Sequence, residues 1–131
     1  KMSETETLTA KDAELTLVVA VNYSGRWDIF QATQAMHKAL SENPDREQTP
    51  EFYASFLSLS EFPDPELLIR TGGDIRLSNF LLWDLAYTEL YFTKTLWPDF
   101  NQSTFADALS FYDSAQRRFG AVTEVEGSHV S

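Results

Sequence analysis

The stretch Leu67-Leu68-Ile69-Arg70-Thr71-Gly72-Gly73-Asp74-Ile75-Arg76-Leu77-Ser78-Asn79 decides how this chain is interpreted. Its apolar start predicts a strand over 67–69, the glycine pair predicts a tight turn, and Ser78 predicts the start of a helix over 78–87. Two guanidinium groups, Arg70 and Arg76, flank the turn beside the expected helix N-terminus. Such a site suits a diphosphate. The alternative is a surface turn in which the arginines pair with nearby carboxylates, namely Asp64, Glu66 or Asp74.

The composition indicates one folded domain with an acidic surface. The chain has 131 residues, of which 43% are hydrophobic and 14% aromatic, enough for a single core. Its net charge of −10 creates a field that repels nucleic acid and anionic lipid headgroups. There is no cysteine, which excludes disulfides and thiolate metal sites. No apolar stretch reaches the roughly 20 residues of a membrane span. We therefore expect a cytoplasmic protein without a transmembrane segment that binds no nucleic acid.

The alternation of strand-like and helix-like segments predicts an α/β fold, with a parallel sheet layered with helices. Three strands are expected, at 15–21, 67–69 and 89–93. About four helices are expected: 28–40, one that begins after Thr49, 78–87, and one from Ser103 or Thr104 to Arg118. Residues 1–14 are expected to be a polar lead-in and 121–131 a disordered tail. Ligands of such sheets bind beyond the carboxyl ends of the strands, where both arginine-bearing loops are expected to lie.

Three other features are each ambiguous when taken alone. Asn22 and Arg26 follow the first expected strand, where they could contact a ligand or simply fix the next helix to the sheet. Glu89 begins the third expected strand, and a lone carboxylate is a poor magnesium site unless a second ligand joins it. Arg118 and Gly120 close the last expected helix, where a cation and a glycine are common for purely structural reasons.

The order of the motifs resembles that of the cis-prenyltransferases, and most closely the bacterial undecaprenyl diphosphate synthase type. The resemblance runs from about Leu15 to Gly120. It rests on five matches in the family's order: Asn22-Tyr23-Ser24-Gly25-Arg26-Trp27-Asp28, the stretch from Ile69 to Trp83, Ala86-Tyr87-Thr88-Glu89-Leu90-Tyr91-Phe92, Trp97-Pro98-Asp99-Phe100 and Arg118-Phe119-Gly120.

This resemblance implies an enzyme of cell-wall lipid-carrier synthesis. It would condense isopentenyl diphosphate with an allylic prenyl diphosphate to make a long polyprenyl diphosphate, with Mg²⁺ as cofactor and Glu89 as a metal ligand. Its membrane contact would be peripheral and made through the product. The residues implied to bind the isopentenyl diphosphate are Arg70, Arg76, Leu77 and Ser78, with support from Asn22, Arg26, Gly72 and Gly73. In a homodimer, Arg118 and Gly120 would reach the diphosphate across the subunit interface.

One part of the family pattern has no counterpart in this sequence. The family's Gly-rich loop with an adjacent aspartate, which binds the allylic diphosphate, is absent, and the only Gly-Gly pair is Gly72-Gly73. We therefore expect residues 15–120 to be the C-terminal half of a larger single-domain fold, and we expect this chain alone to lack prenyl transfer activity. The alternatives are a non-catalytic partner subunit of a prenyltransferase and a generic α/β anion-binding domain.

Overall fold

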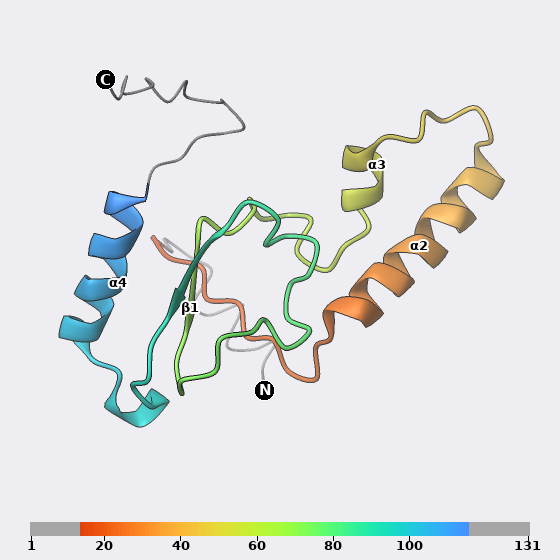
Figure 1. The fold of residues 1–131 in the computed structure, drawn as a ribbon. Helices are drawn as coiled ribbons and strands as arrows, with labels where there is room; N and C mark the ends of the chain where they lie inside the picture. The colour runs from red at the N-terminus through yellow and green to blue at the C-terminus, as the bar shows by residue number, and fades with distance from the viewer. Residues whose placement is uncertain (1–13, 116–131) are drawn as a thin grey trace, which may run out of the picture.

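The structure is a computed structural model that describes residues 14–115, and it has an α/β architecture (Figure 1). Two short parallel strands lie at the centre, with the C-terminal helix on one side and the long α2 helix with the short α3 helix on the other (Figure 1). The elements within the described residues are α2 (Gly25–Glu42), α3 (Pro50–Ala54), β1 (Leu67–Arg70), β2 (Glu89–Phe92), the 3-10 helix η1 (Trp97–Asp99) and α4 (Gln102–Ser114).

The two strands bring the glycine turn and the chain after β2 together. Leu67 pairs with Glu89 at the start of the ladder, and Arg70 pairs with Phe92 at its end. Gly72 and Gly73 follow β1 with φ angles of 90° and 84°, which favour glycine. Their N–H groups donate to the carbonyl oxygens of Thr95 (2.9 Å) and Thr93 (2.9 Å). The turn after β1 is therefore fixed to the segment that leaves β2.

The helices are attached to the strands and to each other by aromatic and polar side chains. The rings of Tyr91 on β2 and Phe111 on α4 lie 5.4 Å apart. On the other side, the Tyr53 hydroxyl of α3 donates to the Ile29 carbonyl of α2 at 2.8 Å. The buried apolar side chains of the described residues are few: Ala32, Phe52, Leu57, Leu81, Leu85 and Ala108.

The strand expected over 15–21 is not present. This segment is irregular, and Leu15 and Leu17 are 83% and 82% exposed. The sheet of the described residues has only two strands, so segment 15–21 has no hydrogen-bonded neighbour there. A β-branched sequence suits a strand, but a strand forms only when a partner supplies the ladder.

The helix expected over 78–87 is also wrong, since this segment is a succession of turns. Ser78, Asn79 and Leu81 have φ angles of 50°, 64° and 43°. Left-handed backbone of this kind cannot continue a right-handed helix, and it costs roughly 1–2 kcal/mol per residue. Leu81 and Leu85 are buried, so their spacing reflects burial of the segment rather than a helix.

The other expected elements are found with shifted bounds. Ser24 caps α2, which begins at Gly25 rather than Asp28, and Thr49 caps α3 as predicted. Asn101 caps α4 through bonds to the N–H groups of Ser103 (3.0 Å) and Thr104 (3.2 Å), and this helix ends at Ser114 rather than Arg118.

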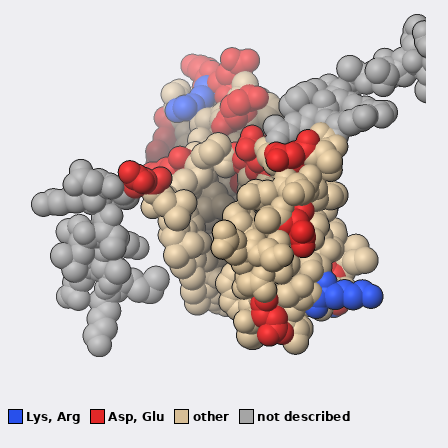
Figure 2. All heavy atoms as spheres, turned by 90° about the vertical axis from the view of Figure 1, so that its left-hand side faces the viewer, with Lys and Arg blue, Asp and Glu red and all other residues tan. Residues whose placement is uncertain are grey.

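Some predictions concern residues outside the range that the structure describes. The expected lead-in, apart from Glu14, and the expected tail lie beyond residues 14–115, as do Arg118 and Gly120. Within 14–115, no helix is long and apolar enough to cross a membrane. Acidic side chains outnumber basic ones on the face shown in Figure 2, as the net charge of −10 implies.

Candidate functional site

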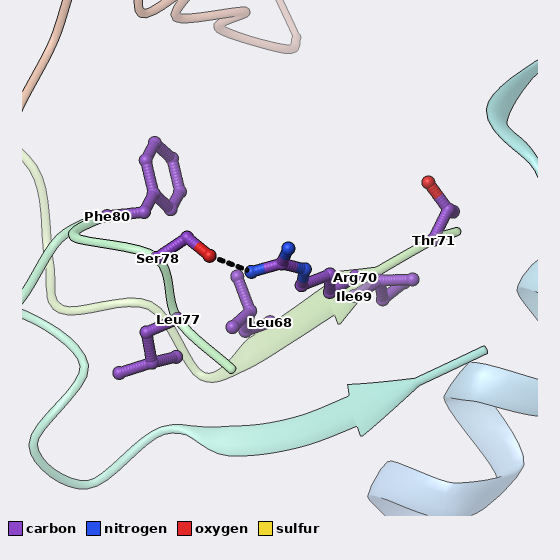
Figure 3. Close-up of a pocket in the computed structure, with 7 residues that line it drawn as sticks. All are labelled: Leu68, Ile69, Arg70, Thr71, Leu77, Ser78 and Phe80. Carbon is purple, nitrogen blue, oxygen red and sulfur yellow. Dashed lines mark hydrogen bonds between the residues drawn. The ribbon is translucent and has the colours of Figure 1, made fainter. Parts of the chain in front are cut away.

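Arg70, the last residue of β1, is the centre of a polar cluster at the carboxyl end of the strand. Its Nη1 donates to the Ser78 hydroxyl at 2.8 Å and to the carbonyl oxygen of Arg76. Its Nη2 donates to Oδ2 of Asp74 at 2.9 Å. Figure 3 shows the Ser78 hydroxyl facing the Arg70 guanidinium across the start of the loop. The structure thus brings Arg70, Arg76 and Ser78 together.

Asp74 joins the two arginines through a single carboxylate oxygen. Arg76 Nη2 donates to the same Oδ2 atom at 2.6 Å. The Arg70 side chain is 23% exposed, whereas those of Asp74 and Arg76 are 45% and 66% exposed. Asp74 is therefore the counter-ion of this turn in the structure, and Arg76 is the arginine that reaches furthest into solvent.

A cleft of about 340 Å³ opens beside the cluster (Figure 3). Its polar lining comes from Arg70, Thr71 and Ser78, and its apolar lining comes from Leu68, Ile69, Leu77 and Phe80. A guanidinium and a hydroxyl at the edge of an apolar wall suit a ligand that has an anionic head and a hydrocarbon body.

The helix N-terminus expected beside the arginines does not form, and the N–H groups of the glycine pair are already bonded. No helix begins at Ser78, and the N–H groups of the glycine pair already donate to Thr93 and Thr95. The N-terminus of α2 is equally occupied, since its first N–H groups donate to Asn79 and Ser24. The expected helix N-terminus therefore supplies no anion ligands here, and the anion ligands that the structure gathers are the guanidinium and hydroxyl side chains.

The residues expected to support the site have different placements. Asn22 is exposed with a left-handed φ of 56°, and Ser24, not Asn22, caps α2. The Arg26 side chain is exposed, but its backbone N–H donates to Oδ1 of Asn79 at 2.9 Å. Sequence reasoning missed Asn79, although its place directly after Ser78 in the quoted stretch was a usable signal.

Two buried carboxylates, Asp28 and Asp84, were also missed. Asp28 accepts hydrogen bonds from the Tyr23 hydroxyl (2.8 Å), Gln31 Nε2 (2.9 Å), and the N–H (3.0 Å) and hydroxyl (2.8 Å) of Ser58. Burial alone would raise the pKa of Asp28, but these bonds outweigh it and hold the pKa below its usual value. Burial raises the pKa of the Tyr23 hydroxyl, and the adjacent Asp28 charge raises it further.

Asp84 has the opposite electrostatic character. It is buried, and within the described residues its Oδ2 has no hydrogen-bond partner. Burial raises the pKa of this carboxyl, and the negative charges of Asp28 and Asp64 raise it further. Asp84 is thus the incompletely hydrogen-bonded carboxylate of the two, whereas Asp28 accepts hydrogen bonds from several protein groups.

Glu89 does not join the arginine cluster. It pairs with Leu67 at the start of the ladder, whereas Arg70 lies at the end. Three residue steps along a strand correspond to about 10 Å, and side chains three apart point to opposite faces. Residues 14–115 contain no group of three or more His, Cys, Asp or Glu side chains that could hold a metal ion.

Comparison with known proteins identifies the family. The sequence model of the family described as "Putative undecaprenyl diphosphate synthase" matches residues 1–120. The chain therefore belongs to the undecaprenyl diphosphate synthase family. This is the class of prenyl-transferring proteins that the order of the sequence motifs resembles.

Individual relatives agree with this assignment. A ditrans,polycis-undecaprenyl-diphosphate synthase, (2E,6E)-farnesyl-diphosphate specific, from Coxiella burnetii is 49% identical over 126 residues, which is 95% of this chain and 53% of that protein. An isoprenyl transferase from Nitrosomonas europaea is 52% identical over 122 residues, which is 91% of this chain and 45% of that protein. The chain thus spans about half the length of the curated relatives it matches.

A solved structure supports the fold. Lavandulyl diphosphate synthase from Lavandula x intermedia, solved with dimethylallyl diphosphate, superposes with a TM-score of 0.83 at 37% identity. The superposition covers 90% of this chain and 52% of that one. The α/β class expected from the sequence is confirmed, although the described residues have two strands and three α-helices rather than three strands and about four helices.

Proposed function

We propose that this chain is part of a cis-prenyltransferase that joins isopentenyl diphosphate to an allylic prenyl diphosphate and makes a long polyprenyl diphosphate of the undecaprenyl type. The observation that carries the proposal is the cleft at which Arg70, Arg76 and Ser78 gather beside an apolar wall. In this proposal the cleft binds isopentenyl diphosphate. The similarity to a synthase described as farnesyl-diphosphate specific supports the same reaction class.

The chemical roles of these residues follow from their groups. A guanidinium presents a planar fork that can bond two phosphate oxygens, which makes Arg70 and Arg76 the anion ligands. The Ser78 hydroxyl can donate to a third oxygen while it keeps its bond from Arg70. Leu68, Leu77 and Phe80 would cover the hydrocarbon part of the substrate. Held in this way, the double bond of the acceptor can attack the allylic carbon as the allylic carbon–oxygen bond breaks, and a proton is then lost.

Magnesium is a proposed cofactor of the intact enzyme, with Glu89 as one ligand. A magnesium ion commonly takes one or two carboxylates together with substrate phosphates. Glu89 suits this use only as one member of such a set, since residues 14–115 contain no group of three or more His, Cys, Asp or Glu side chains that could hold a metal ion. When bound, the ion would offset the charge that develops on a departing diphosphate.

The proposed assembly of the enzyme includes residues outside the described range. In a homodimer, Arg118 and Gly120 would contact the diphosphate across the interface. The allylic diphosphate would bind to parts of the family pattern that this sequence does not contain. This placement, a cytoplasmic location and a peripheral membrane contact made through the product all stay predictions.

Calorimetry with this chain tests the proposed site directly. Isopentenyl diphosphate should bind, inorganic diphosphate should bind more weakly because it lacks the hydrocarbon body, and isopentenol should not bind detectably. A matched control is Arg46→Ala, which removes a cation that lies 4.3 Å from the Phe52 ring centre rather than at the cleft. Equal binding of isopentenyl diphosphate by wild type and Arg70→Ala, or binding lost equally in Arg46→Ala, would contradict the proposed site.

A further inference from the structure

Asn79 links the cleft loop to the start of α2 through three of its atoms. Its carbonyl oxygen accepts from the Gly25 N–H at 2.8 Å, and its Oδ1 accepts from the Arg26 N–H at 2.9 Å. Its Nδ2 donates to the Ser24 hydroxyl at 2.8 Å. We call these four residues, Ser24, Gly25, Arg26 and Asn79, the Asn79 clasp. The clasp joins segments that are more than 50 positions apart in sequence.

The clasp holds a backbone that would otherwise be unfavourable. Ser78, Asn79 and Leu81 all have positive φ angles, each of which a non-glycine residue adopts at a cost. Asparagine is among the residues that tolerate this conformation best, and Asn79 lies between the other two in sequence. A conformation of this kind persists only where its surroundings fix it, and the three bonds of Asn79 provide that restraint.

The contact between the cleft loop and the start of α2 leaves no room for a side chain at Gly25. A Cβ atom at this position would lie 2.8 Å from Leu82 Cγ, 3.0 Å from the Leu82 nitrogen and 3.2 Å from the Asn79 carbonyl oxygen. Two of these neighbours are backbone atoms of the cleft loop, so they cannot move aside as a flexible side chain could. The loop therefore packs directly on the first residue of α2.

The clasp acts next to the arginine cluster. Ser78 directly precedes Asn79, and its hydroxyl accepts from Arg70 Nη1 at 2.8 Å. The same loop supplies Leu77 and Phe80 to the wall of the cleft. The conformation of residue 79 therefore sets where the hydroxyl and the apolar wall stand relative to the guanidinium.

We propose that Asn79 is a positioning residue of the diphosphate cleft, which acts through Ser78 and is itself fixed by Ser24, Gly25 and Arg26. This inference rests on the proposed function, because it assigns Asn79 to the same cleft. Asn79 is not assigned a contact with the substrate. Its effect is to hold a loop geometry that binds the isopentenyl diphosphate.

The test compares Asn79→Ala, Asn79→Gly and Asn101→Ala in the intact enzyme. Asn79→Ala removes two bonds of the clasp and the residue's tolerance of a positive φ. Asn79→Gly removes the same side-chain bonds but restores that tolerance. Asn101→Ala is the matched control, because it removes the cap of α4, away from the cleft.

We expect Asn79→Ala to raise the KM for isopentenyl diphosphate about tenfold, as the loss of about one to two hydrogen bonds would. The KM for the allylic substrate should change less than about twofold. Asn79→Gly should recover part of the loss, and Asn101→Ala should lower the melting temperature with both KM values unchanged. Amide hydrogen exchange at Gly25 and Arg26, measured without ligand, should accelerate in Asn79→Ala and not in Asn101→Ala.

The failures of this inference and of the proposed function are distinguishable. If wild type binds isopentenyl diphosphate and Asn79→Ala binds it equally well, Asn79 is not a positioning residue, although the cleft stands. If Asn79→Ala raises both KM values to the same extent, its role is only structural. If wild type shows no affinity for isopentenyl diphosphate, the proposed function and this inference both fail.

Discussion

Replacing Arg70 by alanine removes the group on which three contacts of the cleft depend: the Ser78 hydroxyl, the Arg76 carbonyl and the Asp74 carboxylate. Arg70 is mostly covered, so in the proposed site its bond to a phosphate oxygen would be only partly weakened by solvent. A hydrogen bond to a charged group contributes about 1.5–3 kcal/mol in such a setting. A loss of about 2 kcal/mol corresponds to a rise of roughly 30-fold in the KM for isopentenyl diphosphate.

The same reasoning predicts a smaller effect for Arg76→Ala. Its side chain is mainly exposed, and exposed ion pairs contribute at most about 1 kcal/mol. The expected rise in KM is therefore about fivefold. The double variant should lose less than the sum of the two single losses, because both guanidinium groups share Asp74 and would act on one ligand in the proposed site.

Steady-state kinetics of the intact enzyme measures these effects. The KM for isopentenyl diphosphate should rise while the KM for the allylic substrate stays within about twofold of wild type. Arg70→Lys should remain impaired, since an ammonium is a point charge without the planar fork. Arg46→Ala serves as the control for loss of a cation elsewhere. Normal KM values for isopentenyl diphosphate in both single variants would show that the cluster is a salt-bridged turn and that the site assignment is wrong.

Three further predictions concern the buried carboxylates and the chain itself. Asp84→Asn should raise the melting temperature at pH 7, because it removes a buried charge, and the gain in stability should be about 1 kcal/mol. Because the pKa of Asp84 is raised in the folded state, this gain should vanish as the pH falls below the usual pKa of 3.8. Asp28→Asn should destabilise at pH 7, and because the folded pKa is lowered, the difference from wild type should shrink as the pH falls from 3.8 through the folded value. Incubated with farnesyl diphosphate, labelled isopentenyl diphosphate and magnesium, this chain alone should give no elongated product, and elongation at the rate of a full-length relative would contradict its assignment as a part of the enzyme.

The sequence predicted the elements whose local signals agree with their surroundings. β1 and β2 lie within one residue of the expected strands, and Thr49 caps α3 as its position before Pro50 indicated. These elements need only a short apolar run or a capping side chain. Segment 15–21 has an equally clear strand pattern, but a pattern cannot supply the neighbouring strand on which pairing depends.

The clustering of the candidate site residues was predictable from the sequence, but the conformation of the loop that carries them was not. The arginine spacing and the glycine pair predicted an anion site in this turn. The structure brings Arg70, Arg76 and Ser78 together, and anion binding by them stays a prediction. The expected helix at Ser78 failed because the conformation of this loop is set by contacts with Ser24 and Gly25, far away in sequence. No local pattern within 67–87 records that contact, so the sequence predicted a helix N-terminus at Ser78 that does not form.

The ion pairs of Asp74 agree with the surface-turn interpretation, but they also leave the turn able to bind an anion. Two guanidinium groups held this close repel each other, and one carboxylate balances only one of the two charges. A guanidinium carries five N–H groups. Asp74 takes one bond from each arginine through a single oxygen, and Arg70 donates further to the Ser78 hydroxyl and the Arg76 carbonyl, which leaves most of the free N–H groups on Arg76. A diphosphate can therefore bond to the remaining donors without displacing Asp74, and it would supply the negative charge that the pair still lacks. The binding hypothesis gives the second arginine a role as an anion ligand, whereas the surface-turn interpretation assigns it only its ion pair with Asp74.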